Sequence, residues 1–133
     1  MTRYPERFDV LCCTNFFGDI LSDLASELSG SLGLAGSMNA SATHCCAQAQ
    51  HGSAPDIAGK NIANPTAMIL SNAMLLNWMG TRHSNPAFHQ AAAAMEAAVD
   101  QVLAEPAART PDLGGKSGTD AFGKRVAAVV AGK

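Results

Sequence analysis

The sequence lacks several features that would place it in well-known classes of protein. No uninterrupted apolar stretch is long enough to span a bilayer, and the first residues, MTRYPERFDV, hold no apolar signal-peptide core. No run of one charge sign occurs, and the net charge is only −2, so no electrostatic footprint for nucleic acid or an anionic membrane is visible. We therefore expect a cytoplasmic protein that binds neither nucleic acid nor a membrane.

The cysteines lack the spacing of a metal site. They form two adjacent pairs, Cys12-Cys13 and Cys45-Cys46, and neighbours on a strand point to opposite faces, so neither pair forms a disulfide easily. His44 stands beside the second pair, but no Cys-x-x-Cys spacing is present. We expect reduced cysteines that pack as small hydrophobic side chains.

The composition indicates a folded domain, and the predicted strands followed by helices indicate an α/β layered fold. With 47% hydrophobic and 15% charged residues in 133, the chain is far from the composition of disordered proteins. We predict strands at Phe8–Thr14 and Thr43–Gln50, and a turn-like segment from Ser31 to Ser37 with a short strand around Leu32–Leu34. The predicted helices are Asp19–Leu28, Thr66–Met79, Pro86–Ala104 and Ser117–Val130. Asn15 can cap the first helix, and Ser29-Gly30 ends it; Gly80 ends the second. Ser117 or Thr119 can cap the last helix.

Two carboxylates on the first predicted helix are candidate metal ligands. Asp19 and Asp23 are four residues apart and share one helix face, where they repel unless a cation lies between them. Magnesium and manganese prefer oxygen ligands of this kind. The alternative is that both are solvated, or that Asp19 complements the helix dipole. The apolar residues around them favour the metal, because unpaired charges are costly in poorly hydrated places.

The segment from His51 to Pro65 is predicted to be a long loop, because its glycines and prolines exclude a regular helix or a central strand. Small residues let a ligand approach the backbone closely, and exposed amides with Ser53 can hold phosphate oxygens. Asp56 can accept hydrogen bonds from ribose hydroxyls and would repel an extra ribose phosphate. The alternative is an ordered turn with nothing bound.

Three motifs resemble those of the β-decarboxylating dehydrogenases, the isocitrate/isopropylmalate dehydrogenase family. They are NFFGDILSD (residues 15–23) continuing to GSLGL (30–34), HGSAPDIAG (51–59) with IANP (62–65), and TPDLGG (110–115) followed by Gly118-Thr119. The likeness covers essentially the whole chain, in family order. It implies an α/β fold that is the carboxy-terminal part of the isopropylmalate-dehydrogenase-like fold, with three or four helices and short strands.

The resemblance also implies roles for particular residues. Asp19 and Asp23 would be ligands of Mg²⁺ or Mn²⁺, and His51 would lie against the adenine of NAD. The remaining cofactor-binding residues would be Gly52, Ser53, Ala54, Asp56, Ile57 and Asn64. In this family the metal binds the hydroxyl and carboxylate of a malate-like 2-hydroxy acid, hydride passes to the nicotinamide, and the metal stabilises the enolate formed as carbon dioxide leaves.

The chain departs from the family in two ways. Many members have Glu-Pro-Val before the histidine of the cofactor loop, whereas this chain has Gln48-Ala49-Gln50. The family's chain is also more than twice as long, and its substrate-clamping arginines, proton-transfer tyrosine and lysine and third metal-binding aspartate lie upstream. No catalytic residue is identified here.

The resemblance therefore predicts a fragment. Residues 1–30 would be a piece of the metal, substrate and dimerisation domain, and residues 31–133 a piece of the cofactor domain. The expected partners are a missing amino-terminal half or second subunit, and the complete enzyme would be a homodimer. The alternatives are a non-catalytic remnant that binds NAD or metal, and an inactive truncated homologue. Isopropylmalate, isocitrate and tartrate remain open as substrates.

Overall fold

The computed structural model describes residues 1–133 and contains four α-helices, one two-stranded sheet and five short 3-10 helices. This confirms the predicted α/β fold. The α-helices and strands are α1 (Asn15–Ser29), β1 (Gly36–Ala40), β2 (Cys45–Ala49), α2 (Thr66–His83), α3 (Pro86–Ala104) and α4 (Thr119–Val130). The 3-10 helices are η1 (Pro5–Arg7), η2 (Leu32–Leu34), η3 (Pro55–Ile57), η4 (Pro106–Ala108) and η5 (Pro111–Leu113). None of the helices combines the length and apolar composition needed to cross a bilayer.

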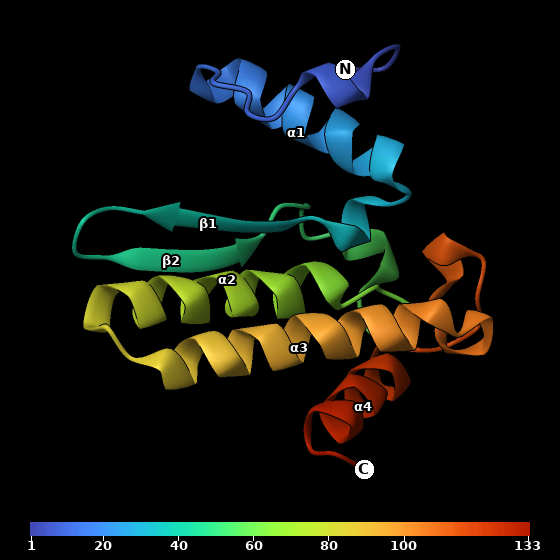
Figure 1. Ribbon diagram of the computed structural model, residues 1–133. Helices are drawn as coiled ribbons and strands as arrows, with labels where there is room; N and C mark the ends of the chain where they lie inside the picture. Colours follow the sequence, from blue (N-terminus) through green and yellow to red (C-terminus); the bar gives the residue numbers. More distant parts are fainter.

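The elements stack in layers (Figure 1). The antiparallel hairpin of β1 and β2 lies on α2, α2 packs on α3, and α3 packs on α4. The hairpin approaches α2 closely, since a Cβ atom on Gly36 would lie 3.0 Å from the backbone nitrogen of Ser71. The buried Ser71 hydroxyl accepts a hydrogen bond from the Ser37 N–H and lies 2.7 Å from the carbonyl oxygen of Gln48, so one side chain joins both strands to the helix.

The hydrophobic core lies between α3, η4 and α4. Phe122 of α4 is fully buried, and its neighbours in the core are Ala98, Val99, Val102, Ala108 and Val126. Small alanines on α3 let the helices approach closely, and the branched residues fill the space between them. Burial of each large apolar side chain contributes about 1.5–3 kcal/mol, so these few residues hold the lower layers together.

Helix α2 extends one turn beyond its predicted end. Gly80 does not terminate the helix; it is buried within it, and a Cβ atom there would lie 2.7 Å from the ring of His89 on α3. The glycine therefore serves close helix packing. The helix ends at His83, and Ser84 takes the left-handed conformation (φ 50°), with its N–H bonded to Gly80 and Thr81 carbonyls.

The predicted strand at Phe8–Thr14 is wrong. These residues form no regular element and are exposed, because no neighbouring strand is present to pair with their backbone. The possible strand around Leu32–Leu34 is the 3-10 helix η2 instead. Helix α1 ends at Gly30 (φ 129°), as its sequence predicts. The predicted cap by Asn15 is wrong, because Asn15 is the first helical residue and Thr14 occupies the cap position without a side-chain hydrogen bond. The predicted strand at Thr43–Gln50 is confirmed as β2, and the helix at Pro86–Ala104 is confirmed as α3.

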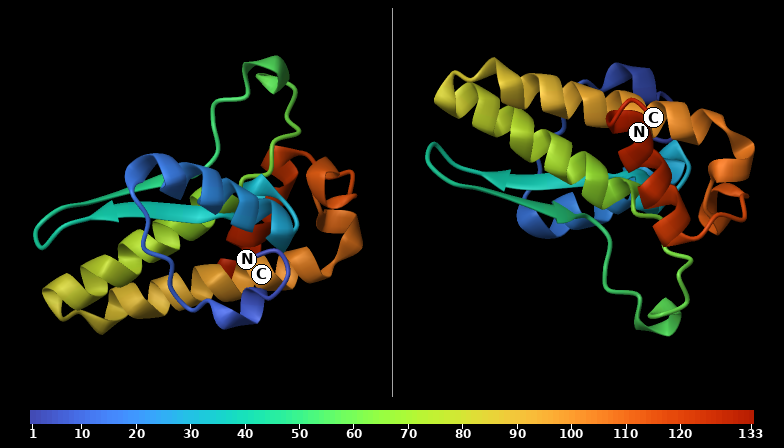
Figure 2. Two further views of the ribbon diagram at one scale, coloured as in Figure 1. Left: turned by 90° about the horizontal axis from the view of Figure 1, so that it is seen from above. Right: turned by 90° about the horizontal axis from the view of Figure 1, so that it is seen from below.

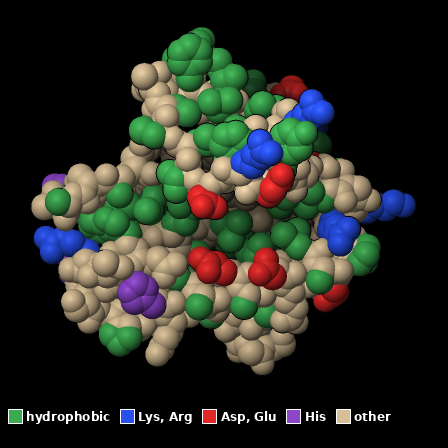
Figure 3. Space-filling view, turned by 45° about the horizontal axis from the view of Figure 1, so that its top comes forward, with side chains coloured by type: hydrophobic (Ala, Val, Ile, Leu, Met, Phe, Trp, Pro, Cys, Tyr) green, Lys and Arg blue, Asp and Glu red, His purple; other side chains and the backbone are tan.

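The amino-terminal region is poorly covered. Hydrophobic side chains gather over the upper part of the molecule in Figure 3, where α1 and the segment before it lie, and Phe16 and Phe17 are 70% and 61% exposed. All four cysteines are free, but Cys12, Cys13 and Cys46 are exposed and only Cys45 is half-buried. The expectation that the cysteines pack as small hydrophobic residues is therefore wrong for three of them.

Candidate functional site

A cavity of about 800 Å³ opens where the loop between β2 and α2 faces η2, η5 and the start of α4. This size lies within the range of small-molecule and cofactor sites. The loop extends away from the layered body (Figure 2), and its small residues form one wall. The lining residues lie in five segments: 31–33, 51–54, 57–64 except 60, 111–112 and 119–120.

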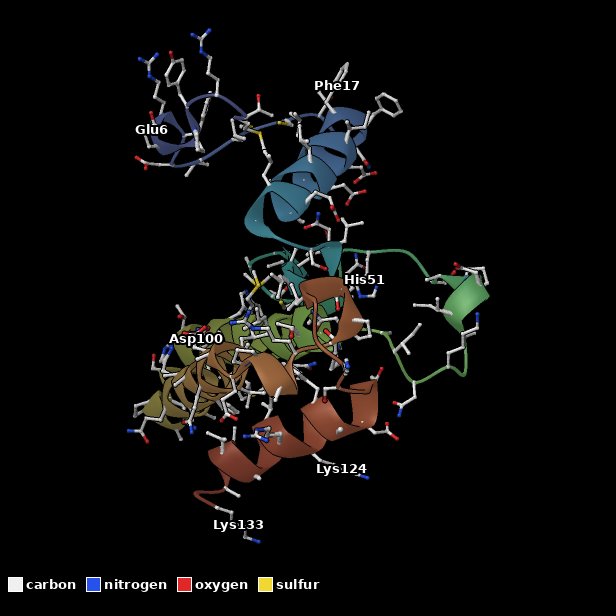
Figure 4. All side chains as sticks on the ribbon, turned by 90° about the vertical axis from the view of Figure 1, so that its right-hand side faces the viewer. Glu6, Phe17, His51, Asp100, Lys124 and Lys133 are labelled. Carbon is white, nitrogen blue, oxygen red and sulfur yellow. The ribbon has the colours of Figure 1, made fainter.

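Six of the seven residues predicted to bind the cofactor line this cavity: His51, Gly52, Ser53, Ala54, Ile57 and Asn64. Ala54 takes the left-handed conformation (φ 42°), which turns the chain into η3. His51 lies at the root of the projecting loop (Figure 4), and its Nδ1 is 2.9 Å from the carbonyl oxygen of Gly52. Asp56 is the exception, since it is exposed on η3 and does not line the cavity.

Asn64 is buried at the floor of the cavity and is held at both ends of its amide. Its Nδ2 donates to Oδ2 of Asp112 at 2.9 Å, and its Oδ1 accepts from the Thr66 N–H at 3.0 Å, which caps α2. Asn64 therefore has a structural task in addition to the adenine contact predicted for it. The same floor holds Asp112, to which sequence reasoning assigned no role, although it stands in the TPDLGG motif.

The Asp112 carboxylate is an ionised hydrogen-bond acceptor. Its oxygens accept from the hydroxyls of Ser31 (2.6 Å) and Thr110 (2.5 Å) as well as from Asn64. Partial burial on its own would raise the pKa of Asp112, but these bonds to the charged form outweigh it, so its pKa lies below the ordinary value. A negative charge held by three hydrogen bonds thus lines the cavity.

The loop also caps helix α4. Asn61 takes the left-handed conformation (φ 55°); its Oδ1 accepts from the Asp120 N–H, and its carbonyl oxygen accepts from the Thr119 N–H. The Thr119 hydroxyl donates to the carbonyl oxygen of Ala63. The predicted cap at Ser117 or Thr119 is wrong, because Gly118 occupies the cap position and no side chain of α4 fills the role.

Asp19 and Asp23 lie one turn apart on α1, and both are exposed. Oδ1 of Asp23 accepts a hydrogen bond from Nε2 of Gln50, which also donates to the hydroxyl of Ser26, both at 3.1 Å. No group of three or more His, Cys, Asp or Glu side chains that could hold a metal ion occurs in the structure. The two carboxylates are hard oxygen donors of the kind that Mg²⁺ and Mn²⁺ prefer.

The sequence and the fold both match those of a dehydrogenase family. Residues 1–126 match the family model of isocitrate/isopropylmalate dehydrogenase, and the chain belongs to this family of oxidoreductases. The expectation drawn from the three motifs is confirmed.

Individual relatives agree with this assignment. The chain is 56% identical to the isocitrate/homoisocitrate dehydrogenase of Thermus thermophilus over 122 residues. This match covers 92% of this chain and 34% of the relative. It is 50% identical over 125 residues to "Isocitrate dehydrogenase [NAD] subunit 2, mitochondrial" of Kluyveromyces lactis, over 90% of this chain and 32% of the relative.

A solved structure shows the same fold. The crystal structure of isocitrate dehydrogenase from Methylococcus capsulatus superposes with a TM-score of 0.86 at 45% identity, over 98% of this chain and 37% of that one. The chain thus spans about a third of the length of the relatives it matches, and its fold corresponds to a carboxy-terminal part of theirs.

Proposed function

We propose that this chain supplies the carboxy-terminal part of an NAD-dependent, divalent-metal-dependent dehydrogenase that oxidatively decarboxylates a malate-like 2-hydroxy acid. The observation that carries the proposal is the cavity of about 800 Å³, which is lined by six of the predicted cofactor residues from both ends of the loop between β2 and α2. Isopropylmalate, isocitrate and tartrate are the candidate substrate types.

The residues around the cavity suit a dinucleotide. Gly52 leaves open space where a side chain would stand, so a ribose or phosphate can approach the backbone, and Ser53 offers a hydroxyl to it. His51 would lie against the adenine, and Asn64 would meet its polar edge. The Kluyveromyces relative, named as an NAD enzyme, supports NAD over NADP.

Asp19 and Asp23 would hold the Mg²⁺ or Mn²⁺ ion. When bound, the ion would polarise the substrate's oxygens as a Lewis acid. In this chain the carboxylates are exposed and belong to no group of three or more acidic, His or Cys side chains, so the remaining protein ligands would come from the amino-terminal part of a complete enzyme. The proposal includes that missing part as partner, a homodimer of the complete enzyme, and a cytoplasmic location.

A chimera tests the proposal directly. The chain would replace the matching 122 residues of the Thermus isocitrate/homoisocitrate dehydrogenase, and NADH formation with isocitrate and Mn²⁺ would be measured. We expect turnover, and Asp23→Asn should raise the Mn²⁺ concentration needed for half-maximal rate. Asp100→Asn, on the exposed side of α3, is the control for lost charge. An unchanged Mn²⁺ titration in Asp23→Asn would refute the metal assignment.

A non-catalytic nucleotide-binding module is the second candidate. It is favoured by one observation: six of the predicted cofactor residues line one cavity, whereas Asp19 and Asp23 belong to no group of three or more metal-binding side chains. A folded chimera that binds NAD but gives no turnover would favour this alternative.

Asp56 stands outside the cavity lining, two residues from Ala54 and one from Ile57, which do line it, and we propose that it sets the cofactor preference when the loop lies against a bound dinucleotide. Because a ribose phosphate next to this carboxylate would meet like charge, Asp56→Ala in the chimera should improve the use of NADP relative to NAD by on the order of 1–3 kcal/mol. The ratio of kcat/KM values for the two cofactors measures this, with Asp100→Ala as the control. Better use of NADP than NAD by the unsubstituted chimera would contradict the role of Asp56.

A further inference from the structure

Three separated parts of the chain converge on one carboxylate at the floor of the cavity. Ser31 lies 81 residues before Asp112 and Asn64 lies 48 residues before it, and both donate to the same oxygen, Oδ2. Thr110 donates to the other oxygen, Oδ1. Hydrogen bonds to an ionised acceptor are roughly twice as strong as neutral ones, so this junction is a rigid point of the structure.

The junction is continuous with the walls of the cavity. The Ser31 hydroxyl, which donates to Asp112, accepts from the Gly33 N–H at 3.1 Å, and this bond shapes η2. On the opposite side, Oδ1 of Asn64 accepts a hydrogen bond from the N–H of Thr66, the first residue of α2. Ser31, Gly33, Asn64 and Asp112 all line the cavity, so the connected residues are the surface that a ligand would touch.

The fit around Asn64 leaves little freedom. A Cβ atom on Gly33 would lie only 2.7 Å from the Cβ of Asn64, so η2 presses directly against this residue. Asn64 is 8% exposed. Without the carboxylate, its amide N–H₂ would lose its only acceptor in the chain, and a buried polar group without a partner costs about 1–3 kcal/mol. The side chain would then turn toward another partner.

We propose that Asp112 is a positioning residue of the nucleotide cavity, which fixes the Asn64 amide and η2 in the arrangement that receives the adenosine part of a dinucleotide. The inference rests on the proposed function for the identity of the ligand. Asp112 acts through Asn64 and Ser31, and its removal should weaken nucleotide binding even where the fold persists.

The test is calorimetric titration of the 133-residue chain with NAD. We expect Asp112→Ala to weaken binding at least tenfold and Asp112→Asn to weaken it less. An asparagine oxygen can still accept from Ser31 and Asn64, and its amide can donate to Thr110. Asp100→Ala, an equal loss of charge on an exposed face of α3, should leave the affinity unchanged. Circular dichroism and the unfolding midpoint would show that each variant is folded at the temperature of the titration.

A double-mutant cycle separates positioning from a general loss of stability. If Asp112 acts through Asn64, Asp112→Ala in an Asn64→Ala background should cost little additional affinity. Additive losses, or an Asp112→Ala chain that binds NAD as the unsubstituted chain does, would overturn the inference. Should Asp112→Ala not fold, Ser31→Ala removes a single donor and should weaken binding about threefold; unchanged affinity would equally overturn it.

The NAD titration of the unsubstituted chain distinguishes failure of the proposed nucleotide site from failure of the positioning role of Asp112. No NAD binding by that chain would count against the nucleotide cavity itself and against Asp112 with it. Binding that is insensitive to Asp112 would refute only the positioning role.

Discussion

Residues 1–30 and residues 31–133 differ sharply in how they are packed. Of the sixteen buried residues, only Ser26 lies in the first region. Helix α1 meets the rest of the chain mainly at η2 and through the side chain of Gln50, whereas α2, α3 and α4 pack against one another around a core. Phe17 on α1 projects away from the body (Figure 4). Both regions have apolar helices, so apolar residues alone do not make a core; they also need a partner surface.

The largest expected effect concerns activity. The isolated chain should give no dehydrogenase turnover with NAD, Mn²⁺ and a panel of malate-like acids, because under the proposed function the groups that hold a substrate in line with the nicotinamide belong to the amino-terminal part of a complete enzyme. Its uncovered apolar surface around α1 should also drive self-association, which sedimentation would detect. Clear NADH production by a well-behaved monomer would contradict both expectations. It would also mean that residues 1–30 need no further partner surface.

A matched pair of substitutions tests the difference in packing. Phe122→Ala removes a fully buried ring from the core and should lower the free energy of unfolding by about 3–5 kcal/mol. Phe17→Ala removes the same atoms from a ring that is 61% exposed and, at concentrations where the chain is monomeric, should change it by no more than about 0.5 kcal/mol. Chemical denaturation below the concentration of self-association measures both. Similar losses in the monomer would mean that another part of the chain covers α1 in solution.

The Gln50 amide is the polar connection between the two regions. Gln50→Val removes its bonds to Asp23 and Ser26 and should weaken the docking of α1 by about 1 kcal/mol. Hydrogen exchange should become faster in α1 and stay unchanged in α3. Gln48→Val, on the exposed face of β2, is the matched control. Equal exchange in α1 for both variants would show that η2 alone holds the helix.

The smallest expected effect concerns how the stability of residues 31–133 depends on acid pH. The pKa of Asp112 is lower in the folded chain than in the unfolded one, where it is about 3.9, so its stabilising contribution is complete above that value. The contribution is lost as the pH falls through the folded-state pKa. Asp112→Asn should therefore lose less stability than the unsubstituted chain as the pH falls below about 5. Parallel curves in denaturant titrations would contradict this.

Sequence reasoning succeeded where local rules decide the structure. Asn85-Pro86 opens α3 as expected, with the Asn85 side chain accepting from the Ala87 N–H, and Gly30 ends α1. The loop of residues 51–65 was predicted because its glycines and prolines exclude regular structure, and the structure adds only η3 to it. These features depend on residues close in the chain.

The errors arise where distant contacts decide. The apolar run at Phe8–Thr14 has strand-like composition, but no second strand lies beside it. Gly80 was predicted to end a helix, but it lies inside α2 and makes room for the ring of His89 on α3. Within the site, the motif residues of the loop were found, whereas the roles of Asp112 and Asn61 depend on partners 48 or more residues away, and no local pattern reveals them.

The cap that Asn61 forms on α4 limits how the loop can vary. A loop that only held a ligand could exchange residues freely as ligand preference changed, but this one also supplies the hydrogen bonds that start a core helix. Insertions between Gly59 and Ala63 would remove Asn61 from its place and release the first turn of the helix that carries Phe122. Changes of specificity are therefore easier to accommodate on the outer half of the loop, around Ser53–Ile57, than on the half that returns to the body.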